Sequence, residues 1–159
     1  MLKVTIIAVG SLKEKFWRDA CAEYVKRLGA YCKPEIIEIE ESKAPDRPND
    51  AQIGAVIEAE GKRIIAKIPK GAAVFPLCIE GQQFDSAAFA ARLDKLAVEG
   101  VSHVTFVIGG SWGLSPAVKQ LGAGMSMSKM TFPHMLARVM LLEQIYRAFQ
   151  ISSGGNYHK

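Results

Sequence analysis

Five apolar runs are spaced along the chain and predict β-strands. They cover residues 2–9, 35–40, 74–79, 103–108 and about 125–131. Polar and apolar residues alternate over 35–40, as in a half-exposed strand, whereas 103–108 is apolar almost throughout. A continuous apolar run is typical of a parallel strand that is buried on both faces. We therefore expect 103–108 to be the most deeply buried strand.

Helical patterns occupy the segments between these runs. The spacing predicts helices over 14–28, 50–68, 85–99 and about 133–150. Gly29 and Gly100 end the first and the third of these helices, since glycine commonly follows the last helical residue. Residues suited to helix starts stand at Asp50, at Asp85 or Ser86, at Ser115-Pro116 and at Pro133.

Strands that alternate with helices indicate an α/β fold, with a parallel sheet flanked by helices on both faces. Residues 41–50 are the most polar and proline-rich stretch, which predicts a mobile loop. No repeat divides the chain, so we expect one domain over 1–159. A chain of this length with 49% hydrophobic residues can form a stable core without disulfides or a structural metal.

The last predicted helix carries apolar residues on every side. A helix of this kind is buried on most of its surface. Because a chain of 159 residues has little room for such burial, we expect the helix to pack against a second subunit in a homodimer. His134 and Arg138 are four residues apart and share one face, and Glu143 and Arg147 form a second i,i+4 pair.

Composition excludes several classes of protein. No apolar run approaches the roughly 20 residues of a membrane span, and residues 2–9 predict a strand, not a secretion signal. Cys21, Cys32 and Cys78 are odd in number and lack metal-type spacing. This pattern favours reduced thiols in a cytoplasmic protein with no metal site.

The net charge of +4 is concentrated near the C-terminus. Residues 103–159 hold five basic residues and one acidic residue, Glu143, so that this part alone carries +4. The first 102 residues hold 15 basic and 15 acidic residues and balance to zero. A basic C-terminal third is compatible with a polyanionic partner, although so small a charge is equally compatible with an ordinary surface.

Two segments at strand ends are candidates for binding a ligand. Ile108-Gly109-Gly110-Ser111-Trp112-Gly113 follows the strand at 103–108, and ligands of parallel sheets bind at the carboxyl ends of strands. Residues 126–134 (SMSKMTFPH) join a strand to a helix through small and hydroxyl residues. Both segments are also compatible with plain connections. Neither matches a phosphate loop or a dinucleotide-binding turn.

The chain ends in Gly154-Gly155-Asn156-Tyr157-His158-Lys159. Chain ends are usually frayed. Here a flexible Gly-Gly precedes an aromatic ring that can stack on a base and an imidazole that can act as acid or base near neutral pH. The sequence is compatible with a disordered tail and with a functional one.

Taken together, the segments IGGSWGLS, SKMTFPH, RVMLLEQIYRAF and the final YHK closely resemble the small bacterial ribosomal RNA large subunit methyltransferases of the SPOUT superfamily. The segments MLKVTIIAVGSLKEKFW and EYVKRL resemble this family too, so the resemblance covers essentially the whole chain. It implies an α/β fold with a C-terminal trefoil knot, a rare exception to the rule against knotted chains. It also implies a homodimer formed through the last helix.

The same resemblance implies the activity. Members of the family transfer a methyl group from S-adenosylmethionine to N3 of a pseudouridine in 23S ribosomal RNA, at the subunit interface of the assembled ribosome. By position, the cofactor would contact Leu77, Gly110, Ser128, Lys129, Met130, Thr131, Phe132 and Pro133. The target nucleotide would face His134, Arg147, Tyr157 and His158.

In this interpretation His158 or His134 accepts the N3 proton, and Arg138 or Arg147 stabilises charge on the base carbonyls. Three alternative hypotheses give the chain a different function. In these the chain would be a cofactor-binding ribosome assembly module, a methyltransferase acting on tRNA, or a structural dimer without a ligand. The tRNA enzymes of this superfamily often carry an added RNA-binding domain, and we expect no such domain in this chain.

Overall fold

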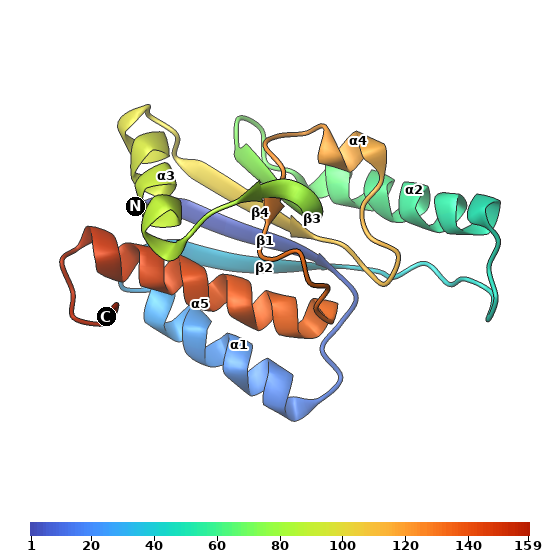
Figure 1. Ribbon diagram of the computed structural model, residues 1–159, viewed down its shortest axis with the longest axis horizontal. Helices are drawn as coiled ribbons and strands as arrows, with labels where there is room; N and C mark the ends of the chain where they lie inside the picture. Colours follow the sequence, from blue (N-terminus) through green and yellow to red (C-terminus); the bar gives the residue numbers. More distant parts are fainter.

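Five parallel strands form one sheet in the order β2-β1-β4-β3-β5 (Figure 1). The computed structural model describes residues 1–159. The strands are β1 (Lys3–Val9), β2 (Lys33–Ile39), β3 (Ala73–Gln83), β4 (His103–Ile108) and β5 (Met125–Ser126). β4 lies between β1 and β3, and five of its six residues are buried, so it is a buried parallel strand as its apolar run predicts. It is not the most deeply buried strand, because six of the seven residues of β1 are buried.

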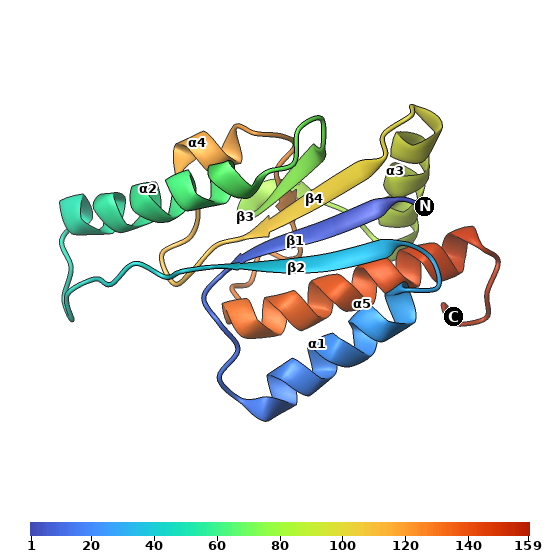
Figure 2. The same ribbon diagram turned by 180° about the vertical axis from the view of Figure 1, so that it is seen from behind.

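Helices cover both faces of the sheet. They are α1 (Lys15–Leu28), α2 (Asp50–Lys67), α3 (Ser86–Val98), α4 (Pro116–Lys119) and α5 (His134–Ser152). α1, α3 and α5 pack on one face, with α5 in contact with both of the others, and α2 and α4 lie on the opposite face (Figures 1 and 2). The predicted parallel sheet flanked by helices is confirmed. No helix combines the length and the apolar character needed to cross a bilayer.

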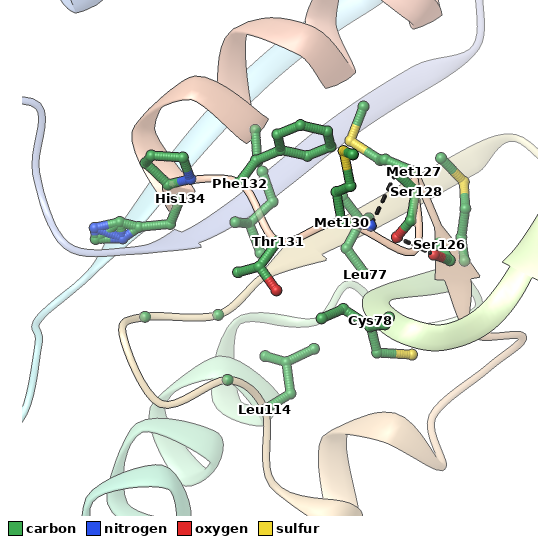
Figure 3. Close-up of a pocket in the computed structure, with 18 of the residues that line it drawn as sticks. Leu77, Cys78, Leu114, Ser126, Met127, Ser128, Met130, Thr131, Phe132 and His134 are labelled. Carbon is green, nitrogen blue, oxygen red and sulfur yellow. Dashed lines mark hydrogen bonds between the residues drawn. The ribbon is translucent and has the colours of Figure 1, made fainter.

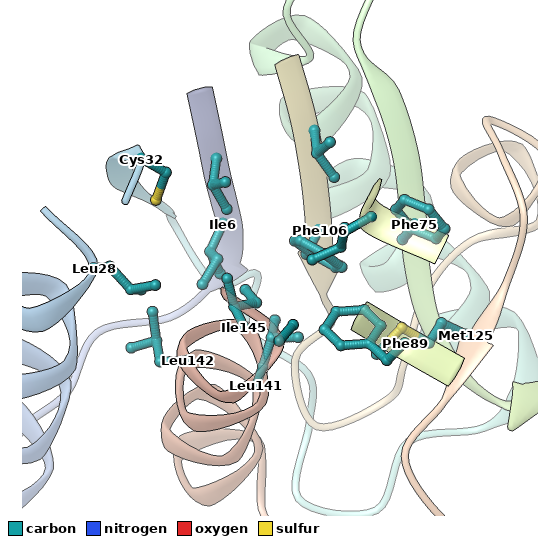
Figure 4. Close-up of a cluster of buried hydrophobic side chains, with 14 of the residues drawn as sticks. Ile6, Leu28, Cys32, Phe75, Phe89, Phe106, Met125, Leu141, Leu142 and Ile145 are labelled. Atoms are coloured by element: carbon teal, nitrogen blue, oxygen red, sulfur yellow. The ribbon is translucent and has the colours of Figure 1, made fainter. Parts of the chain in front are cut away.

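The core follows from the alternation of side chains along the strands. In β1, Ile6 joins the larger buried cluster beneath α1, α3 and α5, whereas Ile7 joins the smaller cluster beneath α2 and α4. Leu141 and Ile145 project from α5 toward the sheet, and Leu142 lies beside Leu28 of α1 (Figure 4). All three are at most 1% exposed, so this side of α5 is the centre of the larger cluster.

The structure corrects two details of the predicted helix starts and confirms a third. α2 is capped by Asn49 and not by Asp50, because Asn49 accepts from the Gln52 N–H at 2.8 Å while the Gln52 side chain accepts from the Asn49 N–H at 2.9 Å. This reciprocal pair satisfies two backbone donors at once. Pro133 is the N-cap of α5, one residue before the helix begins. Asp85 caps α3, as one of the two predicted alternatives.

The fifth strand is shorter than the predicted 125–131. It contains only Met125 and Ser126, and the chain then continues as an irregular loop to Pro133. Ser126 Oγ donates to the Ser128 carbonyl at 2.9 Å, and Ser128 Oγ accepts from the Met130 N–H at 3.0 Å. Such local bonds between hydroxyl groups and backbone compete with a strand ladder and end it here.

Glycines allow the segment 122–125 to press against β3. A Cβ atom on Gly122 would lie 1.9 Å from the Val74 carbonyl oxygen, and one on Gly81 would lie 2.6 Å from the Gly124 carbonyl carbon. No side chain fits at either place, so only glycine permits this approach. The contact brings β5 alongside β3. The trefoil knot implied by the family resemblance stays a prediction.

Truncation of the core side of α5 tests this packing. We expect Leu141→Ala to lower the free energy of unfolding by about 2–5 kcal/mol, because Leu141 is fully buried and its removal leaves a cavity. The matched control is Leu121→Ala at a residue 37% exposed, which should lower it by less than about 1 kcal/mol. Denaturant unfolding monitored by circular dichroism measures both, and equal effects would contradict the assignment of α5 to the core.

Candidate functional site

A cavity of about 750 Å³ opens beside the middle of β3 and the carboxyl ends of β4 and β5 (Figure 3). Its walls come from residues 77–80 within β3, from 108–114 after β4 without Trp112, and from 125–135 without Lys129, together with Lys119 and Ala137. Half of the lining residues are hydrophobic. The volume lies within the range of roughly 300–1,000 Å³ that is typical of small-molecule sites.

Both ligand-binding segments predicted from the sequence line this one cavity. Of the residues predicted to hold a cofactor, those that line it are Leu77, Gly110, Ser128, Met130, Thr131, Phe132 and Pro133. Lys129 does not line it, and its side chain is exposed. In Figure 3, Phe132, Thr131 and Met130 lie across the cavity from Leu77, Cys78 and Leu114.

The glycine segment closes into a tight turn at the cavity wall. The Gly113 N–H donates to the Gly110 carbonyl at 3.1 Å, and Gly113 has a φ of +84°, in the left-handed region that favours glycine. A Cβ on Gly109 would lie 2.8 Å from the Gly113 carbonyl carbon. These restrictions explain why glycines occupy both ends of the turn. The result is a wall of bare backbone that a ligand can approach closely.

Sequence reasoning missed the charged rim of the cavity. Lys119, at the end of α4, forms an ion pair with Glu80 of β3, and both side chains line the cavity. The hydrogen bond from Lys119 lowers the pKa of the Glu80 carboxyl. These residues are 39 positions apart, and no local pattern connects them. Only the pairing of β3 with β4 and β5 brings them together.

His134 and Arg138 share a face of α5, as predicted, but they have different environments. His134 lines the cavity and also a second, more polar cavity of about 860 Å³, with which the first shares Ser111, His134 and Met135. Burial lowers the pKa of His134, the nearby Arg138 charge lowers it further, and Glu41 opposes them. The imidazole is therefore neutral at neutral pH.

Arg138 is only 4% exposed and lines neither cavity. Its guanidinium donates to Glu38 at 2.7 Å and to the Gly10 carbonyl at 3.2 Å. The side chain therefore ties the start of α5 to the ends of β1 and β2. Of the two arginines predicted to stabilise charge on the base, Arg138 therefore has a structural role, because its guanidinium is bonded to Glu38 and Gly10.

The other predicted site residues gather near the C-terminus. Arg147 pairs with Glu143 at 2.7 Å, Tyr157 donates to Glu143 at 2.9 Å, and Arg147 Nη1 lies 3.1 Å from His158 Nδ1. The guanidinium of Arg147 also lies over the Tyr157 ring, 4.7 Å from its centroid. Partial burial, together with the contact to Glu143, raises the pKa of Tyr157 to about 12. The tail is thus folded against α5 by four named side chains, which we call the tail cluster: Glu143, Arg147, Tyr157 and His158.

One chain does not bring the tail cluster to its own cavity. His134 and Arg147 are 13 residues apart on one helix, which corresponds to about 20 Å at roughly 1.5 Å per residue. Figure 1 shows the C-terminus beside the far end of α5 from its first turn. Of the four residues predicted to face the target, only His134 lines the cavity.

Comparison with known proteins identifies similar chains. The sequence profile described as "Predicted SPOUT methyltransferase" matches residues 2–158. The chain is 51% identical to the ribosomal RNA large subunit methyltransferase H of Listeria monocytogenes and 50% identical to that of Exiguobacterium sibiricum. It is 49% identical to the protein of the same name from Streptococcus thermophilus. Each similarity covers 99% of this chain and the full length of the relative.

The environment of His134 can be checked by titration. Nuclear magnetic resonance of the imidazole protons should give a His134 pKa below 6.5, because burial disfavours the charged ring. Glu41→Gln should lower it further, since the Glu41 charge favours the protonated form. The control Glu35→Gln should instead lower the pKa of His103, which Glu35 raises. A His134 midpoint at or above 6.5 would contradict the buried placement.

Proposed function

This chain belongs to the SPOUT methyltransferase family, and from this premise we propose that it transfers a methyl group from S-adenosylmethionine to N3 of a pseudouridine in 23S ribosomal RNA, on the assembled ribosome. The single observation that carries the proposal is the cavity formed by β3 and the segments that follow β4 and β5, which contains both segments expected to hold the cofactor. The printed names of the similar proteins, ribosomal RNA large subunit methyltransferases, support the choice of substrate.

The residues present suit S-adenosylmethionine chemically. The apolar side chains of Leu77, Leu114 and Phe132 offer a surface for the adenine, and the irregular loop 127–133 offers backbone groups beside them. The bare turn at Gly109 and Gly110 permits close approach of the ribose. Glu80 and Lys119 on the rim supply one negative and one positive group, the charges needed to hold the ammonium and the carboxylate of the cofactor's amino-acid end.

A homodimer would complete the site. Buried residues of α5 face the sheet, while Leu136 and Met140 are half-exposed and outside the buried cluster. A two-fold axis perpendicular to α5, passing between the two copies of the helix near Met140, would lay them antiparallel. The tail cluster of one subunit would then meet the His134 end of the other, since Met140 lies about midway between His134 and Arg147. We propose this arrangement as the dimer and as the reason why the predicted site residues are split.

Methyl transfer requires alignment and removal of the N3 proton. The bound cofactor supplies an electrophilic methyl group. For N3 to accept this methyl group, its proton would have to pass to a base that the protein holds beside it. His134 is neutral because burial lowers its pKa, so its imidazole can take the proton, directly or through water. His158 of a partner subunit is the alternative base. Arg147 of the same partner tail would stabilise charge on the base carbonyls.

The first test is transfer of label from S-adenosylmethionine to three substrates taken from a strain that lacks this protein. These are intact ribosomes, isolated large subunits and naked ribosomal RNA. We expect label in large-subunit RNA of intact ribosomes, because a chain of this size offers few RNA contacts of its own and depends on a preformed surface. Mapping of the labelled nucleotide then tests the pseudouridine assignment.

Two outcomes would contradict the proposal. Cofactor binding without transfer to any ribosomal substrate would favour a cofactor-binding assembly module. Transfer to bulk tRNA from the same strain, and none to ribosomes, would favour the tRNA alternative.

Mixing of two defective chains tests the shared site. His134→Ala and a chain that lacks residues 156–159 should each be almost inactive as homodimers. Random mixing forms half mixed dimers, each with one intact site of two, so about a quarter of wild-type activity should return. The measurement is methyl transfer after the two proteins are unfolded and refolded together.

The matched control refolds each variant alone. Activity that stays at the level of the separate variants after mixing would show that each chain uses its own tail, and would refute the shared arrangement.

A further inference from the structure

Glu60 of α2 is a buried carboxylate outside the cavity lining. It is 2% exposed, and its Oε2 accepts from the Ser42 N–H at 2.9 Å. Its other oxygen, Oε1, is fully buried and has no hydrogen-bond partner. Buried carboxylates in proteins are normally paired or fully hydrogen-bonded. The unpaired oxygen of Glu60 is therefore an exception to this rule and requires an explanation.

The carboxylate lies directly behind the glycine turn of the cavity. A Cβ on Gly110 would stand 3.4 Å from Glu60 Oε1 and 3.6 Å from Oε2, and Gly110 itself lines the cavity. α2 is fixed at this position because Gly61 packs on Ser115, where a Cβ would lie 2.5 Å from Oγ. The Glu60 charge is thus separated from the cavity by the backbone of a residue that has no side chain.

The charged groups around Glu60 define its electrostatic environment. Burial raises the pKa of Glu60, and the charge of Glu41 adds to this effect. The Ser42 N–H and the charge of Arg63 oppose it and favour the carboxylate form. Glu41 also lies at the turn, with Oε1 3.5 Å from Ser111 Oγ. Negative charge therefore flanks the turn on the side away from the cavity, and little water intervenes to screen Glu60.

The proposed methyl donor and its product differ chiefly in charge. The donor carries a positive sulfonium, whereas the product of transfer has an uncharged thioether at the same atom and lacks one methyl group. We propose that Glu60, acting through the turn at Gly110, is a specificity-determining residue that favours the cationic methyl donor over its uncharged demethylated product. The inference rests on the proposed function, because it requires this cofactor in the cavity.

Binding measurements test the inference without the methyl transfer reaction. Calorimetry at mildly alkaline pH would compare S-adenosylmethionine, S-adenosylhomocysteine and sinefungin, which carries an ammonium in place of the sulfonium methyl group. In Glu60→Gln we expect the affinity for the two cationic ligands to fall on the order of tenfold, the scale of an attraction between unit charges about 12 Å apart at an effective dielectric constant of about 20. The affinity for S-adenosylhomocysteine should stay unchanged.

Two variants serve as controls. Glu58→Gln removes a carboxylate two residues away whose side chain is 70% exposed, and it should leave all three affinities unchanged. Glu60→Asp keeps the charge and should retain most of the preference for cationic ligands. Glu60→Gln should fold, because the amide oxygen can still accept from Ser42 and an uncharged group is less costly to bury. Its melting temperature, measured alongside, should equal or exceed that of the wild type.

The outcomes separate the possible roles. Equal weakening of all three ligands would show that Glu60 only shapes the turn and would overturn the inference, as would an unchanged preference in Glu60→Gln. Wild-type protein that binds none of the three ligands would instead overturn the proposed cofactor, and the role of Glu60 with it.

Discussion

The close approach of residues 122–125 to β3 is the constraint on which the rest of this structure depends. Gly81 and Gly122 leave no space for a side chain, so backbone meets backbone and β5 is held beside β3. The loop that follows β5 is thereby placed opposite Leu77 and next to the turn at Gly110. If this contact were opened by a single Cβ atom, the three walls of the cavity would no longer share an edge of the sheet. The fold and the cavity therefore depend on the same few glycines.

Sequence patterns predicted the parts of the molecule that are determined locally. The apolar run at 103–108 and the glycine segment after it lie where the pattern placed them, because burial and turn geometry are encoded by adjacent residues. The predicted length of β5 was wrong, because serine hydroxyl groups form hydrogen bonds with the local backbone and the apolar pattern does not register them. The pair of Glu80 with Lys119 was missed because it depends on strand order, which no local pattern contains.

The predicted site residues are divided between the two ends of α5, and local sequence patterns could not predict this division either. A resemblance assigns roles by position and says nothing of which chain supplies each residue. His134 and the tail cluster lie at opposite ends of α5, and a straight helix cannot bring its own ends together. Two antiparallel copies of the helix would bring His134 of one subunit next to the tail cluster of the other. In the proposed dimer, the apolar character of α5 on every side would have two causes, because one face is buried on the sheet and another would contact the second subunit.

The location of the unsatisfied polar atoms strengthens the link between the fold and its site. Four buried side-chain atoms lack partners, on Glu60, Thr105, His134 and Arg138. Thr105 lies within β4, but the other three surround the carboxyl ends of β1, β2 and β4. Each such atom destabilises a fold by about 1–3 kcal/mol. The well-packed cluster beneath α5 tolerates this loss, whereas a sequence shaped by stability alone would place apolar residues at these positions. Two of these atoms, on His134 and Glu60, lie at the cavity wall or directly behind it, so their polar groups are ones that the stability of the fold does not require, whereas Arg138 also ties α5 to β1 and β2.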